Sequence, residues 1–100
     1  MNEQTEAQQL PFNPRILVID DEKRIRDGCY KVLTGEGFEV ARAETGKQGI
    51  EMIEEAHYDI ILLDLMMPGL SGFDVLGHVK SLHPDTVVIV ISGYATIEHS

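Results

Sequence analysis

The chain has 100 residues, of which 43% are hydrophobic and 25% charged, and its formal net charge is −9 at pH 7. This length fits one domain with one core, and the acidic balance argues against direct nucleic-acid binding by this segment, which would need a basic patch. No apolar run is long enough to cross a membrane, and the single cysteine, Cys29, is typical of a protein of the reducing cytoplasm.

The first 14 residues are polar and acidic and end in a segment that contains Pro11 and Pro14. Such a composition predicts a disordered leader over residues 1–14, followed by a domain over residues 15–100.

The remaining residues alternate between strand-like and helix-like patterns, which predicts a parallel α/β fold. Strands are expected over residues 15–20, 39–43, 59–64 and 86–91. Helices are expected over residues 23–34, 45–57 and 71–82, and a fourth helix is expected to begin near Thr96 and to continue to the end of the chain. A doubly wound sheet with right-handed crossovers then has the strand order 2-1-3-4.

Each expected helix has an apolar face and a start signal. The apolar positions are Ile25, Cys29, Val32 and Leu33 in the first helix, Ile50, Met52 and Ile53 in the second, and Phe73, Leu76, Val79 and Leu82 in the third. Thr45 with Gln48, and Ser71 with Asp74, have the spacing of helix-capping pairs. Gly69 and Gly72 are interpreted as loop glycines.

Three apolar runs end in polar residues that together define one site. The first runs into Asp20 and Asp21, the second into Asp64 and the third into Ser92. Because ligands of open α/β sheets bind beyond the carboxyl ends of the strands, these side chains are expected to meet at one edge. Three neighbouring carboxylates repel one another and raise each other's pKa. A hard divalent cation such as Mg²⁺ would relieve that repulsion.

Asp64 is the first candidate for chemistry, because a carboxylate can attack a phosphoryl group and form an aspartyl phosphate. The alternative is an ordinary aspartate that ends a strand and caps the next turn, and Asp20 and Asp21 likewise could cap the first helix. Ser92 is uninformative alone and gains value only from its expected position beside Asp64.

Three segments together resemble the response-regulator receiver domains of two-component signalling. They are Ile19-Asp20-Asp21-Glu22, the stretch from Leu63 to Gly69, and Ile91-Ser92-Gly93-Tyr94-Ala95. The last segment, continued by Thr96, is similar to receivers of enhancer-binding transcriptional activators of the nitrogen-regulatory type. The resemblance covers residues 15–100 and implies a flavodoxin-like doubly wound sheet.

The resemblance also implies a role for each matching residue. Asp64 matches the phospho-acceptor, Asp20 and Asp21 match the acids that hold Mg²⁺, and the backbone carbonyl of Met66 matches a further metal ligand. Ser92 matches the hydroxyl that turns toward the phosphoryl group. The implied partners are a histidine kinase that donates the phosphoryl group and an output domain or protein contacted through the face of the fourth helix.

The chain departs from the receiver pattern at its carboxyl end. The fifth strand with its lysine and the fifth helix of receivers have no counterpart here, so the domain is expected to be incomplete within its fourth helix and prone to self-association. Lys80 cannot replace that lysine, because it is expected on the third helix.

The expected function is therefore a phosphorylation-dependent switch with a transcriptional output. No enzyme activity is expected beyond Mg²⁺-assisted self-phosphorylation. Two alternatives remain from the residues alone. One is an aspartyl-nucleophile phosphatase, which would need an acid at the position of Met66. The other is a receiver-like docking module without phosphotransfer.

Overall fold

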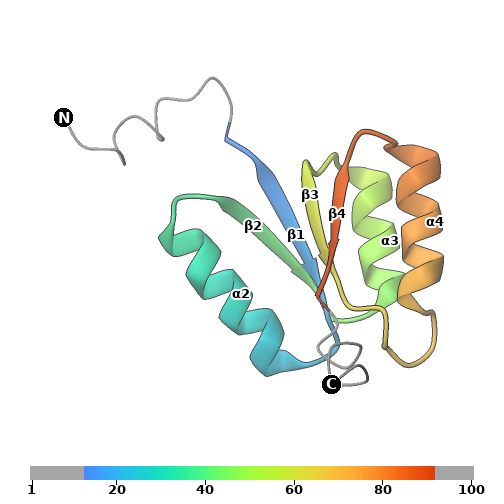
Figure 1. Ribbon diagram of the computed structural model, residues 1–100, viewed down its shortest axis with the longest axis horizontal. Helices are drawn as coiled ribbons and strands as arrows, with labels where there is room; N and C mark the ends of the chain where they lie inside the picture. The colour runs from blue at the N-terminus through green and yellow to red at the C-terminus, as the bar shows by residue number, and fades with distance from the viewer. Residues whose placement is uncertain (1–12, 92–100) are drawn as a thin grey trace, which may run out of the picture.

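The computed structural model describes residues 13–91, which form one parallel sheet between helices (Figure 1). In chain order the elements are β1 (Arg15–Ile19), α2 (Lys23–Gly35), β2 (Glu39–Ala43), α3 (Gly46–Glu55), β3 (Ile60–Leu63), α4 (Gly72–Leu82) and β4 (Val87–Val90). Helix α2 lies on one face of the sheet, and α3 and α4 lie side by side on the other (Figure 1). The expected alternation of strands and helices is confirmed, with boundaries that differ by one or two residues.

The sheet has the predicted order, β2-β1-β3-β4, and every neighbouring pair is parallel. The register places Ile19 beside both Ala43 and Leu63, and Leu63 beside Val90. The carboxyl ends of all four strands are therefore level at one edge.

The main core fills the space between the sheet and the layer of α3 and α4. Its fully buried members include Leu17, Ile19, Ile53, Ile61 and Val79. The central strand β1 is buried on both faces from Ile16 to Ile19, as its unbroken apolar run predicts. The site at the carboxyl edge thus follows directly after a strand that is buried on both faces.

The predicted start signals of α3 and α4 are both present. The Thr45 hydroxyl accepts a hydrogen bond from the backbone N–H of Gln48, while the Gln48 side chain accepts from Glu44 and not from Thr45. At α4 the capping box is complete, because Ser71 and Asp74 each accept from the other's backbone N–H.

The inner face predicted for the first helix is partly wrong. Ile25 is 37% and Val32 65% exposed, whereas Arg26 is buried. Helix α2 packs against β1 and β2, and within residues 13–91 no second helix covers its remaining apolar side. The periodicity correctly marked an apolar stripe but could not show how much of it is covered.

The face predicted for the third helix is shifted as well. Val75 and Val79 are buried against the core, whereas Phe73 is 64% and Leu82 45% exposed. Helix α4 packs onto α3, and its β-branched residues Val75 and Val79 join the core cluster, whereas the larger Phe73 and Leu82 lie at the margin of the contact.

The apolar run of β4 suits a strand inside a complete sheet, but in this chain the strand is expected to lie at an open edge with its apolar surface uncovered. The structure confirms this expectation for the residues that it describes. Val87 is 56%, Ile89 46% and Val90 48% exposed. The strand pairs with β3 alone within residues 13–91, so it forms an edge of the sheet.

Of the expected leader over residues 1–14, only residues 13 and 14 belong to the described part of the chain. Ser92 and the expected start of a fourth helix lie outside it. Among residues 13–91, no helix combines the length and the apolar character that a membrane span requires.

Candidate functional site

Two backbone hydrogen bonds extend the sheet just beyond the strand ends and fix the positions of the candidate aspartates. The N–H of Asp64 donates to the carbonyl of Ile19 at 3.0 Å, and the N–H of Asp20 donates to the carbonyl of Ala43 at 3.2 Å. Since Asp20 follows Ile19 directly, the first and third strands deliver their aspartates to adjoining positions.

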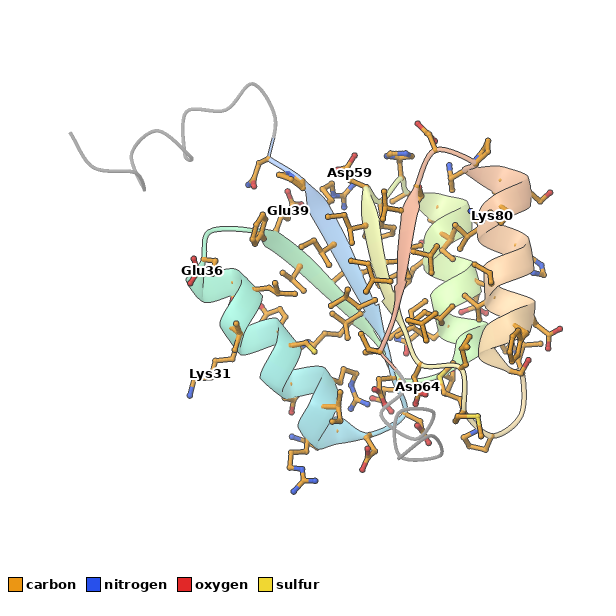
Figure 2. The ribbon with its side chains drawn as sticks, in the orientation of Figure 1. Lys31, Glu36, Glu39, Asp59, Asp64 and Lys80 are labelled. Atoms are coloured by element: carbon orange, nitrogen blue, oxygen red, sulfur yellow. The ribbon has the colours of Figure 1, made fainter. Side chains whose placement is uncertain are left out.

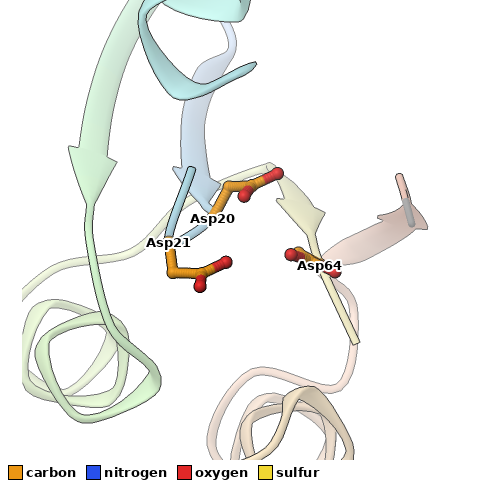
Figure 3. Close-up of side chains that lie close together, drawn as sticks. All are labelled: Asp20, Asp21 and Asp64. Carbon is orange, nitrogen blue, oxygen red and sulfur yellow. The ribbon is translucent and has the colours of Figure 1, made fainter. Parts of the chain in front are cut away.

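The three carboxylates meet at this edge. Asp20, Asp21 and Asp64 each offer a carboxylate oxygen, and these oxygens all lie within 4.8 Å of one another. Figure 3 shows Asp20 and Asp21 in the segment after β1 and Asp64 facing them from the end of β3. The structure therefore brings together the three acids that the sequence singled out.

Two of these carboxylates are oriented by the backbone that follows them. Oδ1 of Asp20 accepts from the N–H of Glu22 at 2.9 Å, and Oδ1 of Asp64 accepts from the N–H of Met66 at 2.9 Å. Each turn occupies one lone pair of one oxygen, so that this oxygen and the second oxygen can both still take a ligand. The capping alternative for Asp21 is not observed, because the N-cap of α2 is Glu22, whose own side chain makes no capping hydrogen bond.

Gly72 is a site residue that sequence reasoning missed. It is the first residue of α4 and not a loop glycine, and a Cβ at this position would lie 2.5 Å from the carbonyl oxygen of Asp64 and 2.5 Å from Cα of Leu65. Only glycine lets the start of α4 lie this close to the backbone that carries Asp64. The available sequence signal was a glycine placed directly after the N-cap Ser71.

Gly69 is the loop glycine that the sequence predicted. Its φ of +74° falls in the left-handed region, which glycine adopts without steric cost. The segment between β3 and α4 therefore turns at Gly69 and is held close to the site at Gly72.

Burial and neighbouring negative charge raise the pKa of Asp20 from 3.8 to about 6, against the lowering effect of its bond from Glu22. Burial is the largest cause, and Asp64 and Asp21 add repulsion. The sequence predicted repulsion as the reason for raised pKa values, and for Asp20 it is the smaller contribution.

This pKa predicts how the metal-free protein responds to pH. Between pH 4 and 6 the folded Asp20 holds a proton that the unfolded chain has lost, so the free energy of unfolding should fall as pH rises through this range. We expect a loss of roughly 1–2 kcal/mol between pH 4.5 and 7. Urea unfolding in chelator measures it, and Asp20→Asn should remove the difference; a wild-type slope retained in Asp20→Asn would assign the effect elsewhere.

The donor set fits a hard divalent cation. Mg²⁺ prefers oxygen ligands at about 2.1 Å in octahedral geometry, which places ligand oxygens about 3–4 Å apart. The carboxylate oxygens of Asp20, Asp21 and Asp64 are close to that spacing before any adjustment. Bound Mg²⁺ would offset the repulsion among them.

Asp21 offers the most direct test of this metal site, because its carboxylate is exposed and takes no part in the two turns described above. We expect Asp21→Ala to weaken Mg²⁺ binding about 10-fold or more while leaving the fold intact. Isothermal titration with Mg²⁺ measures this change. Asp85→Ala, which removes an exposed carboxylate with 84% of its side chain accessible, is the matched control. Equal Mg²⁺ affinity in Asp21→Ala and wild type would contradict the assignment.

The remaining residues named from the sequence lie at different distances from the acidic cluster or outside the described part of the chain. Met66 lies beside the acidic cluster, with its side chain exposed and its N–H bound to Asp64. Ser92 lies outside the described residues, although its neighbour Ile91 donates its N–H to the carbonyl of Leu63 at 3.0 Å. Lys80 lies on α4 near the end of the domain opposite to Asp64, as expected (Figure 2).

Comparisons with known proteins agree with this architecture. The response regulator receiver domain family matches residues 16–100. Response regulator RR06 of Streptococcus pneumoniae is 44% identical over 77 residues, which are 77% of this chain and 35% of that protein. The chain thus spans about a third of the length of this curated relative.

Solved structures show the same fold. Response regulator TrrA of Thermotoga maritima, in complex with Mg²⁺-BeF, has a TM-score of 0.78 and 34% identity over 87% of this chain and 76% of that chain. In a complex of histidine kinase ThkA with TrrA, the match has a TM-score of 0.74 and 37% identity over 81% of this chain and 70% of that chain. NtrX of Brucella abortus, in complex with ADP, matches with a TM-score of 0.79 and 34% identity over 87% of this chain and 20% of that chain.

A doubly wound parallel domain with three carboxylates at the carboxyl ends of its central strands defines the class of phospho-accepting receivers. The chain belongs to the response regulator receiver domain family of two-component systems, and Mg²⁺ is the cofactor that its acidic cluster fits. Receivers are phospho-accepting switches and not turnover enzymes in the ordinary sense.

Proposed function

We propose that this domain accepts a phosphoryl group on Asp64 from the phosphohistidine of a histidine kinase and thereby switches an output. The observation that supports this most strongly is the group of three carboxylates within 4.8 Å at the carboxyl edge of the sheet. The complex of TrrA with ThkA supports a histidine kinase as the partner.

The geometry of Asp64 suits a nucleophile. One carboxylate oxygen is bound by the N–H of Met66, which fixes the plane of the group, and the other is free to attack. In the transfer an O–P bond to Asp64 forms while the N–P bond of phosphohistidine breaks, and the electron pair of that bond returns to the imidazole nitrogen. A bound Mg²⁺ supplies positive charge beside the phosphoryl oxygens.

The other residues divide the supporting tasks. Asp20, Asp21, Asp64 and the backbone carbonyl of Met66 would hold the metal, and the hydroxyl of Ser92 would form a hydrogen bond with the added phosphoryl group. The support for Ser92 is its sequence neighbour Ile91, which is hydrogen-bonded to the strand that ends in Asp64. The added charge would then shift a two-state equilibrium of the segment after β4 and so regulate an output domain or partner, transcriptional in kind.

Phosphorus NMR with phosphoramidate as donor tests this proposal and separates it from its rivals. Phosphoramidate also carries its phosphoryl group on nitrogen, so the receiver function predicts an acyl-phosphate signal that needs Mg²⁺ and disappears in chelator. A phosphatase would instead release phosphate from p-nitrophenyl phosphate catalytically. A docking module would bind neither Mg²⁺ nor phosphoryl groups, and that result would overturn the proposal.

The exposed edge at β4 supports a further expectation, that the 100-residue chain self-associates. An apolar edge strand presents unpaired backbone groups and a surface for another chain. We expect the mass measured by multi-angle light scattering to rise with concentration in wild type and to fall toward that of a monomer in Ile89→Lys. Phe73→Lys is the control, because it adds the same charge at an exposed apolar position on α4. A monomer at all concentrations would contradict this expectation.

We also propose that residues 15–100 are the receiver domain, preceded by a leader over residues 1–14, and that the protein works in the cytoplasm. The family match over residues 16–100 supports the first boundary. The unpaired Cys29 supports a reducing compartment.

A further inference from the structure

Arg26 is a buried charged side chain that the proposed mechanism does not use. It is 9% exposed, although it lies in the first turn of a surface helix where arginine is ordinarily solvated. No carboxylate of residues 13–91 lies within ion-pair distance of its guanidinium. A buried guanidinium without such a partner needs another reason for its position.

The reason lies in its contact with the segment between β1 and α2. Nη1 of Arg26 donates a buried hydrogen bond of 2.9 Å to the backbone carbonyl of Asp20. Asp20 directly follows Ile19, the last residue of β1, so its carbonyl lies beyond the end of the strand. The guanidinium of Arg26 donates a hydrogen bond to this carbonyl. The backbone N–H of Arg26 also donates to the carbonyl of Glu22 at 3.0 Å.

These bonds constrain the segment that carries two of the three carboxylates. Asp20 is held at its N–H by Ala43, at its carbonyl by Arg26 and at its carboxylate by Glu22. Removing the guanidinium would free the carbonyl and loosen the turn, since a hydrogen bond to a charged group is among the stronger ones in proteins.

We propose that Arg26 is a positioning residue, whose guanidinium clamps the carbonyl of Asp20 and so holds Asp20 and Asp21 in the geometry that binds Mg²⁺. This inference rests on the proposed function, because it assigns Arg26 a task in the same metal site. In this role Arg26 would contact neither the metal nor the phosphoryl group.

The electrostatic effect of Arg26 opposes its positioning effect, which makes the two separable. A positive charge beneath the acidic cluster repels Mg²⁺, so a purely electrostatic role predicts tighter Mg²⁺ binding once the charge is removed. A positioning role predicts weaker binding. A merely structural role predicts lower stability with unchanged Mg²⁺ affinity in the folded fraction.

The test compares Arg26→Met, Arg26→Lys and the control Arg24→Met. Arg24 lies two residues away on the same helix and is exposed, so its replacement removes the same charge without the clamp. Isothermal titration with Mg²⁺, below the unfolding temperature of each variant, should show affinity about 10-fold or more weaker in Arg26→Met. Arg26→Lys should recover part of the loss, because lysine keeps the charge and can still donate a hydrogen bond. Arg24→Met should bind as wild type does.

Amide hydrogen exchange in the metal-free proteins supplies a readout that does not depend on Mg²⁺. The N–H of Glu22, bound to the carboxylate of Asp20, should exchange about 10-fold faster in Arg26→Met, while amides in α4 should exchange as in wild type. Unchanged exchange at Glu22, or unchanged or tighter Mg²⁺ binding in Arg26→Met, would overturn the inference. If wild type bound no Mg²⁺ the proposed function would fail, and the exchange at Glu22 would still decide whether Arg26 clamps the turn.

Discussion

Asp64→Asn is expected to abolish phosphoryl transfer to the protein and, in chelator, to raise the free energy of unfolding. The amide is a poor nucleophile, so covalent transfer at this position should fall below detection. The stability gain, roughly 1 kcal/mol, follows because one of three crowded negative charges is removed. An asparagine can still accept the hydrogen bond from the N–H of Met66, so the turn should survive.

Thermal unfolding in chelator measures the second part of this prediction. Asp85→Asn is the control, because it makes the same chemical change at an exposed carboxylate that lies before β4, at the opposite end of the strand from Ile91. If Asp64→Asn unfolded at a lower temperature than wild type in chelator, the cluster would be a structural feature and not a destabilising functional one.

Gly72→Ala is expected to destabilise the fold and to weaken Mg²⁺ binding at the same time. The new Cβ would lie 2.5 Å from the carbonyl oxygen of Asp64 and 2.5 Å from Cα of Leu65. Both atoms belong to the backbone, so no side-chain rotation relieves the overlap and the start of α4 must move away from the end of β3. We expect a loss of about 1–3 kcal/mol in the free energy of unfolding and a displaced Asp64.

Gly77→Ala is the matched control for this substitution. Gly77 lies in the same helix, and a Cβ there would meet nothing within 4 Å. Alanine at an exposed helical position should stabilise the protein by about 0.5–1 kcal/mol. Urea unfolding and Mg²⁺ titration of both variants measure these effects. If Gly72→Ala were as stable as Gly77→Ala, the close approach of α4 to the backbone of Asp64 and Leu65 would not require glycine.

The fold was predictable because its signals are local and repeated. The apolar run from Ile16 to Ile19 identified the central strand. The βα repeats, joined by right-handed crossovers in a doubly wound sheet, predicted the strand order. Strand order in turn placed Asp20 and Asp64 side by side, so the acidic cluster followed from topology alone.

What the sequence could not predict depends on tertiary coverage. Ile25, Val32 and Phe73 carry the apolar periodicity of a buried face and are nevertheless exposed, because periodicity does not show which neighbours cover a helix. Sequence analysis did not identify Arg26 and Gly72 as site residues for a related reason. An arginine in a first helical turn is ordinarily a solvated residue, and a glycine beside Ser71 is ordinarily a loop residue, until the neighbouring backbone is known.

Ser92 and the regulatory output stay predictions. Ser92 lies outside the described residues, and the chain spans 35% of the length of RR06. The proposed switch after phosphorylation rests on the hydrogen bond of Ile91 to Leu63 and on membership of the receiver family. A structure of the phosphorylated protein would test it.

The most direct test of the central claim locates the phosphoryl group on the chain. The protein is incubated with phosphoramidate and Mg²⁺ and then reduced with borohydride, which converts an aspartyl phosphate to homoserine, and peptide mass spectrometry finds the modified position. We predict homoserine at position 64 of the Mg²⁺ sample and its absence in chelator. Homoserine at another aspartate, or modification of Asp64 that is equally extensive in chelator, would contradict the account.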